Sequence, residues 1–415
     1  MPPAVARHPL PIPALREALW EVFRTHFALH RGAWRRVTPG PAEAADPRAA
    51  LGAAGWRAAG REVMALHEAY TARRQGFAHQ ENPLLRLQAG YLLYYLPRNL
   101  FRVYHVLQGL PWAAGNAPDA VAPWVEVSGG ERRLRWLDLG CGPGSLSLAV
   151  LGWLAGGATP TRRPPPLHVV LVDQSRELLA LAEAALRTFA ARALPGVPLT
   201  VETHPQGVEA YLAEEGGATF GLVGAAFSLN ELKLLAPGRS SRRAQRFTDP
   251  VRRLTRPGGL MLAVEAGTRR GYLNLMAVRD QWRPRPILYP CPHGQDCPMF
   301  NARVTHWCHA TVPLPRSFFF DEPLRERAGI DFRMRELNLG ALAVQNLEGQ
   351  APGAPFRARS GQRAVSDPMP ARGAPGRAAE RPRIVLVCGP QGRLSEIPAG
   401  GLGPHPRGLW LEGGR

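Results

Sequence analysis

The sequence predicts an α/β protein with a doubly wound, mostly parallel sheet, preceded by a helical region. Two observations support this class. From residue 134 onward, short apolar runs typical of buried strands alternate with amphipathic helical stretches. Upstream, apolar residues recur at helical spacing and strand alternation is absent. The 415 residues are enough for two or three domains.

Residues 1–124 are expected to form an N-terminal helical region. Helical periodicity predicts helices at Ala14–Phe27, Ala58–Tyr70 and Leu84–Leu110. Pro97 predicts a kink or a break in the third helix, because proline has no amide hydrogen to donate. Thr38–Asp46 is expected to be a loop.

Residues 125–282 are expected to form the Rossmann-like core. The predicted strands are Leu134–Gly140, Leu167–Asp173, Leu199–His204, Phe220–Leu229 and Gly258–Gly267. The predicted helices are Ser145–Leu154, Arg176–Leu194 and Tyr272–Trp282.

The remainder is divided by composition. Residues 283–331 form a cysteine-rich insertion, and no regular structure is expected through 283–316, which contains seven prolines. Residues 332–397 are expected to supply the remaining strands around a Pro/Gly/Arg-rich loop at 350–382. The predicted elements there are Phe332–Gln345, helical or strand-like, and the strand Ile384–Cys388. Residues 398–415 are expected to be a flexible tail.

The composition indicates the class of partner. The formal net charge is +18, and Lys233 is the only lysine. Such a charge favours a polyanion such as RNA. Arg239–Arg256 holds seven arginines and one acid, although a solvated surface in an arginine-biased proteome is the alternative. We expect no membrane partner, because the sequence lacks the roughly 20-residue apolar run of a spanning helix. Five cysteines favour a reducing compartment, and a monomer is favoured.

A glycine loop links the first predicted core strand to the following helix. The segment LDLGCGPG contains Gly140, Gly142 and Gly144, which allow close approach of the backbone to a ligand at a helix N-terminus. Asp173, at the tip of the next strand, would accept hydrogen bonds from ribose hydroxyls. NAD and S-adenosylmethionine both suit such a loop. With Asp138 before the glycines, it resembles the first motif of class I S-adenosylmethionine-dependent methyltransferases. The candidate cofactor-binding residues are therefore Asp138, Gly140, Gly142, Gly144 and Asp173. A degenerate pocket that keeps the fold without the ligand is the alternative.

The sequence does not identify the atom that would be methylated. The segment Phe227–Leu232 is not the Asn/Asp-Pro-Pro-aromatic loop of amino methylases, and it has no cysteine to attack a pyrimidine ring. Asn230 and Glu231 are catalytic candidates as polar groups facing a substrate. They are equally suited to cap a following helix.

Three cysteines lie within 18 residues. Cys291, Cys297 and Cys308 have five and ten residues between them. Clustered thiols in a reducing compartment indicate a metal site, and Cys388 is available as a fourth ligand. The spacing does not distinguish zinc from an iron–sulfur cluster. Three histidines nearby are spare donors: His293, His306 and His309. Cys141 is expected to be a small buried residue of the glycine loop.

Several segments together resemble the mitochondrial small-ribosomal-subunit methyltransferase-like protein family and its bacterial relatives. They are YYLPRNLFRVYHVL (94–107), LDLGCGPG (137–144), SLNEL (228–232), VEAGTRRGY (264–272), PCPHGQDCP (290–298), WCH (307–309) and VCGPQGRL (387–394). The cysteine segments are the most specific, because other methyltransferases lack them. A departure occurs at Glu265–Thr268, where the family tends to have Glu-Pro-Gly-Thr.

The resemblance implies a class I methyltransferase fold that carries a 4Fe-4S cluster. The implied ligands are Cys291, Cys297, Cys308 and Cys388. It also implies binding to the small ribosomal subunit and its rRNA, during assembly or translation. The chain would act there as a methyltransferase, or as an inactive assembly factor with the fold as a scaffold. A zinc-stabilised methyltransferase for another substrate is the remaining alternative. The expected location is the cytoplasm of a bacterium or, in a eukaryote, the mitochondrial matrix.

Overall fold

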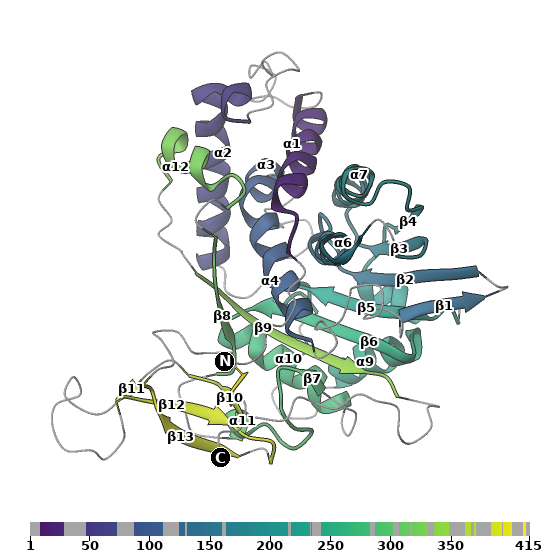
Figure 1. Ribbon diagram of the computed structural model, residues 1–415, viewed down its shortest axis with the longest axis vertical. Coiled ribbons are helices and arrows are strands. Elements are labelled where there is room, and N and C mark those ends of the chain that lie inside the picture. The colour runs from purple at the N-terminus through teal and green to yellow at the C-terminus, as the bar shows by residue number, and fades with distance from the viewer. Residues whose placement is uncertain are drawn as a thin grey trace. The chain divides into compact units, whose positions relative to one another are not determined.

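The chain forms two compact units. The first comprises residues 1–108, 113–214 and 314–335, and the second comprises 109–112, 215–313 and 336–415. The computed structural model (Figure 1) describes residues 9–28, 47–72, 87–110, 124–128, 131–159, 163–214, 217–232, 234, 242–282, 287–301, 307–315, 318–330, 336–347, 362–366, 369–370, 383–391, 393–400 and 410–411.

The first unit begins with helices, as the apolar periodicity predicts. They are α1 (Ile12–Ala28), α2 (Pro47–Ala72), α3 (Gln88–Gly90) and α4 (Leu96–Gly109), with α12 (Asp321–Ala328) packed on α2. Between α3 and α4 lies a π-helical turn, η4 (Tyr91–Tyr95). The irregularity predicted at Pro97 is therefore this π turn, just before the proline, and the helix continues beyond it. The loop expected at Thr38–Asp46 lies outside the described residues.

Three strands of the first unit pair in parallel. They are β2 (Glu131–Leu139), β3 (Leu167–Val172) and β4 (Leu199–His204), and β1 (Val125–Ser128) adds to β2 antiparallel. The connecting helices are α6 (Ser145–Gly157) and α7 (Arg176–Ala193), and α8 (Val208–Ala213) follows β4.

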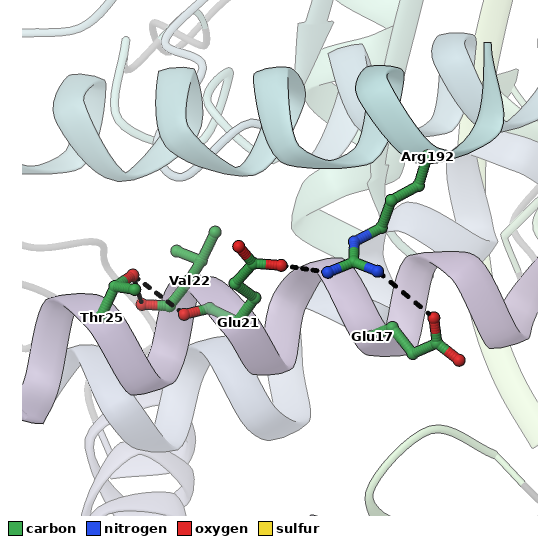
Figure 2. Close-up of polar contacts among 5 residues, drawn as sticks. All are labelled: Glu17, Glu21, Val22, Thr25 and Arg192. Carbon is green, nitrogen blue, oxygen red and sulfur yellow. Dashed lines mark hydrogen bonds and ion pairs between the residues drawn. The ribbon is translucent and has the colours of Figure 1, made fainter. Parts of the chain in front are cut away.

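An ion-pair bridge joins α1 to α7. Arg192 of α7 reaches Glu21, and its other terminal nitrogen lies 3.6 Å from a Glu17 carboxylate oxygen (Figure 2). Deeper in the unit, the guanidinium of Arg98 lies over the ring of Tyr94 and pairs with Asp321 at 2.7 Å. These contacts add specific polar links to helix packing that is otherwise apolar.

The second unit contains parallel and antiparallel strands. Strands β5 (Phe220–Ala226) and β6 (Thr255–Ala266) are parallel. Strand β9 (Glu336–Gln345) runs antiparallel to β6, and both β7 (Ile287–Tyr289) and β8 (Ala310–Pro313) pair antiparallel with β9. Helices α9 (Arg242–Leu254) and α10 (Arg269–Trp282) pack on each other, and α11 (Pro298–Asn301) is a single turn.

A small antiparallel sheet lies near the C-terminus of the second unit. It contains β10 (Gln362–Ala364), β11 (Met369–Pro370), β12 (Arg383–Cys388), β13 (Leu394–Pro398) and β14 (Trp410–Leu411). Its core consists of Ala364, Val385 and Val387, against which Ile397, Ala399 and Leu411 pack.

The α/β class with parallel strands is confirmed, but some local predictions are wrong. Residues 283–316 were expected to lack regular structure, yet they contain β7, α11 and β8. Strands β10 and β11 lie within the expected loop at 350–382, and β14 lies within the expected tail. Each is too short for a periodic signal and forms through long-range pairing. Strand β5 stops at Ala226, because Phe227 has a positive φ of 62°.

Within the segment Phe332–Gln345, which was expected to be helical or strand-like, the described residues form strand β9 from Glu336 onward. The strand predicted at Ile384–Cys388 is β12. None of the described helices is long and apolar enough to cross a membrane.

Candidate functional site

The glycine loop of the first unit has the predicted strand–turn–helix setting. Gly140, Gly142 and Gly144 have positive φ values of 65°, 50° and 87°. The Gly140 and Cys141 amides donate to the carbonyl oxygen of Val172 at 2.8 and 3.0 Å, which ties the loop to β3. A Cβ on Gly142 would have no heavy atom within 4 Å, so the loop is open on that side. This open backbone is where a ligand would approach.

Asp173 lies beside the glycine loop, as its place after β3 predicts. One carboxylate oxygen accepts the Gly142 amide at 2.9 Å, and the other accepts the Ser175 amide at 2.9 Å. The Ser175 hydroxyl in turn accepts the Leu178 amide and caps α7. Asp173 therefore couples the loop to a helix N-terminus. A ribose hydroxyl would therefore share acceptors that already hold the backbone.

Asp138 is directed into the protein. It is 1% exposed, and one carboxylate oxygen accepts the Ser147 hydroxyl at 2.7 Å and the Ser147 amide at 3.2 Å. The indole nitrogen of Trp136 donates to the same hydroxyl at 3.0 Å. Burial raises the pKa of Asp138 to about 7. This carboxyl holds the first turn of α6, which fixes the helix N-terminus behind the glycine loop.

Asn230 lies in a buried polar network of the second unit. The side chain of Asn230 donates to Glu265, while the Asn274 amide donates to the Asn230 side-chain oxygen at 2.9 Å. Glu265 also accepts the Leu229 amide at 2.9 Å. Burial raises the pKa of Glu265, which is 0% exposed, to about 8.

These contacts favour a role for Asn230 in holding the loop after β5. Residues 229–232 are turns, Glu231 is exposed, and the next helix in the described part of the chain starts at Arg242. Sequence reasoning missed Glu265. The available signal was an acid inside the otherwise apolar run of β6.

The four predicted thiols gather in the second unit. Cys291 follows β7, Cys297 precedes α11, Cys308 precedes β8 and Cys388 ends β12. Burial raises the pKa of Cys291 to about 11, with Cys297 and Cys308 adding to the effect. Burial and the other three thiols also raise the pKa of Cys388 well above its ordinary value. Long-range folding has thus brought Cys388 into electrostatic range of cysteines 80 or more residues away.

Each thiol has a polar partner of its own. Two of these partners are arginines: Arg363 donates to the Cys308 sulfur at 3.4 Å, and the charge of Arg279 acts to lower the pKa of the Cys291 thiol. Of the others, the Tyr272 hydroxyl lies 3.5 Å from the Cys297 sulfur, and His293 Nε2 lies 3.2 Å from the Cys388 sulfur. Donors aimed at sulfur are the usual environment of metal-bound thiolates.

The described residues contain no group of three or more His, Cys, Asp or Glu arranged to hold a metal ion. The structure therefore brings the thiols near one another without forming a compact single-ion cage. An iron–sulfur cluster occupies volume between its ligands, so its thiolates stand further apart than those around one ion. His309 Nδ1 lies 3.0 Å from the Trp307 carbonyl oxygen, and His306 lies outside the described residues. The donor set, four thiols with polar or cationic neighbours, is compatible with a cluster.

Known proteins match part of the chain in sequence. Residues 166–320 match the model of the mitochondrial small ribosomal subunit Rsm22 family. Over this segment, the chain is similar to the Rsm22 family. The Rsm22 segment includes β3 to β6 and three of the four thiols.

A human relative of the chain is the ribosome assembly protein METTL17, mitochondrial. It is 31% identical over 161 residues, which are 35% of this chain. The match covers about a third (32%) of the length of that relative.

Two of the solved structures similar to the chain are named as methyltransferases. A putative class I S-adenosylmethionine-dependent methyltransferase from Listeria monocytogenes has a TM-score of 0.38 and 13% identity, over 82% of this chain and 91% of that one. An arsenic(III) S-adenosylmethionine methyltransferase from Chlamydomonas reinhardtii has a TM-score of 0.28 and 15% identity, over 61% and 78%.

Proposed function

We propose that this chain is a ribosome-associated, methyltransferase-like protein that binds small-subunit rRNA during ribosome assembly or translation. It binds S-adenosylmethionine at the glycine loop and carries a 4Fe-4S cluster on Cys291, Cys297, Cys308 and Cys388. The observation that carries the proposal is the gathering of these four thiols around a segment of the Rsm22 family. In a eukaryote its proposed place is the mitochondrial matrix, and the human relative is named as a mitochondrial protein. In a bacterium its proposed place is the cytoplasm.

The geometry of the glycine loop supports S-adenosylmethionine as the ligand. Three left-handed glycines expose backbone next to the N-terminus of α6, and Asp173 lies at the adjacent strand end. The residues that would hold the cofactor are Gly140, Gly142, Gly144 and Asp173. Asp138 would hold them in place from behind through Ser147.

Helix α9 supports rRNA as the partner. Its exposed side chains include Arg242, Arg246 and Arg253, and its buried face is apolar. At 100° per residue the three arginines fall within an arc of about 40° and extend along about 16 Å of helix. The one acid, Asp249, pairs with Arg252, which is turned to the Gln281 carbonyl oxygen. The result is a line of guanidinium groups, which match phosphate oxygens.

The first experiment tests the metal. The chain is purified without oxygen, its ultraviolet–visible spectrum is recorded, and iron, sulfide and zinc are assayed on the same sample. A broad band near about 400 nm with about four irons and four sulfides per chain is expected for a four-thiolate cluster. A colourless protein with one zinc per chain would contradict the cluster and favour a structural zinc site.

A second experiment separates methyl transfer from scaffolding. Immature small subunits are incubated with the chain and S-adenosylmethionine labelled on the methyl group. Incorporation that the Asp173→Ala variant loses would identify an enzyme. Cofactor and ribosome binding without incorporation would identify an assembly factor that keeps the fold.

A further inference from the structure

We propose that Arg279 and Arg363 set the reduction potential of the group held by the four thiols, with Arg363 acting through Cys308 and Arg279 through Cys291. This inference rests on the proposed cluster. Under this inference, the two arginines are not ligands themselves. They position the ligand thiolates and balance their negative charge.

Both arginines are buried to a degree that demands charged or strongly polar partners. Arg279 is 0% exposed and Arg363 is 1% exposed. Arginine is almost never fully buried unless it is paired, because removing its charge from water costs several kcal/mol. The second unit therefore must supply each guanidinium with compensation inside the protein.

The partners of Arg363 are a sulfur and a phenol. One terminal nitrogen donates to the Cys308 sulfur at 3.4 Å, and the other donates to the Tyr289 hydroxyl at 3.1 Å. The guanidinium carbon also lies 4.8 Å from the centre of the Tyr289 ring. Among the described residues, no carboxylate pairs with Arg363. When the Cys308 sulfur is a thiolate, its negative charge therefore balances the positive charge of the buried Arg363 guanidinium.

Arg279 is fixed against the loop that joins two of the thiols. It donates to the carbonyl oxygens of Gln295 at 2.5 Å and His293 at 3.4 Å, and it lies within electrostatic range of the Cys291 thiol. In the described part of the chain its carboxylate partner is Asp280, 3.4 Å away and 42% exposed, where water screens the pair. Arg279 thus places a second buried cation beside the thiols.

The consequence is electrostatic. A four-iron cluster gains one negative charge on one-electron reduction, and a cation bonded to a ligand sulfur stabilises the reduced form more than the oxidised form. Hydrogen bonds to the sulfurs and local charge are established determinants of cluster potentials. Loss of either cation therefore shifts the potential to a more negative value. At the other two thiols the polar neighbours are uncharged or titratable side chains: Tyr272 lies beside Cys297, and His293 lies beside Cys388.

Arg363 offers the cleaner test, because Arg279 also supports the loop backbone. The full chain is loaded with iron and sulfide without oxygen, and its potential is measured by titration with dithionite and redox mediators. Arg363→Gln is expected to keep about four irons and to shift the reduction equilibrium at least tenfold toward the oxidised form, which is 59 mV for one electron. Arg363→Lys is expected to recover part of the shift, since it keeps the charge but loses the fork.

Arg393→Gln is the matched control, because Arg393 is an exposed arginine in the turn after Cys388. Its potential should equal that of the wild type. If Arg363→Gln loses iron, Tyr289→Phe becomes the deciding variant. It removes the hydroxyl that accepts a hydrogen bond from the Arg363 guanidinium, so the reduction potential should shift in the same direction by a smaller amount.

Three results would overturn parts of this reasoning. A loaded Arg363→Gln protein with the wild-type potential refutes the inference and leaves the proposed cluster intact. Loss of iron from all three variants, Arg363→Gln, Arg363→Lys and Tyr289→Phe, also refutes it, because the arginine would then serve assembly alone. A wild-type chain that binds no iron–sulfur cluster instead refutes the proposed function.

Discussion

Replacing Ser147 with alanine should destabilise the first unit by about 2–4 kcal/mol. The side chain is 0% exposed and joins two strand residues, Trp136 and Asp138, to the start of α6. The substitution removes a hydrogen bond to a carboxyl, worth about 1.5–3 kcal/mol if it is charged. It also leaves the indole N–H of Trp136 buried without an acceptor, which adds about 1–3 kcal/mol. Structural relaxation lowers the sum.

A double-mutant cycle tests the assignment of that energy. Urea unfolding is followed by far-ultraviolet circular dichroism for Ser147→Ala, Trp136→Phe and the double variant. In the double variant no indole is left without an acceptor, so the two single effects should exceed the combined effect by about 1–2 kcal/mol. Ser145→Ala is the control: Ser145 is buried on the same helix, and its side chain makes no hydrogen bond among the described residues, so its cost should stay near 0.5 kcal/mol or below. A coupling energy of zero would refute the proposed chain of hydrogen bonds.

Three further predictions concern charge. Burial raises the pKa of the Asp138 carboxyl to about 7 in the folded chain, against about 4 in the unfolded chain. The free energy of unfolding gained from its protonation is therefore fully present below about pH 4 and is lost as the pH rises through about 7. Asp138→Asn should therefore gain stability relative to the wild type between about pH 5 and pH 8, and a pH-independent difference in the free energy of unfolding would contradict this. Arg192→Ala should cost about 0.5–1 kcal/mol at low salt and less at 1 M salt, since its ion pairs are half-exposed; an unchanged cost at high salt in urea titrations would show that packing dominates. Arg246→Gln with Arg253→Gln should reduce the salt dependence of rRNA affinity by a slope of about 1–2, whereas an unchanged slope in filter binding across salt concentrations would place the RNA elsewhere.

The parallel strands and the glycine loop were predictable because their signals are local. Strands such as β3 are continuous apolar runs between turn residues, and the glycines follow one of them directly. The four cysteines were predictable as a set through the resemblance, since their spacing alone leaves the fourth thiol and the metal open.

The partners of those residues could not be predicted in the same way. Arg363 lies inside a Pro/Gly/Arg-rich segment that composition assigns to a loop, and its burial depends on β10 pairing with a strand some 20 residues later. The direction in which the Asp138 side chain points could not be predicted either, because a strand residue before a glycine loop can face a ligand or the following helix. Tertiary packing decides such cases, and no periodic pattern records it.

The position of Cys388 has a consequence for the order of events during synthesis. The ribosome completes Cys291, Cys297 and Cys308 early, and then makes 80 further residues before the fourth thiol is present. At the usual elongation rates that interval lasts roughly 4–16 s. During it the nascent chain presents three thiols without the β12 strand that brings the last one. Under the proposed assignment, the four-thiol site can therefore close only once residue 388 has been synthesised, so a chain truncated before Cys388 would lack the complete site.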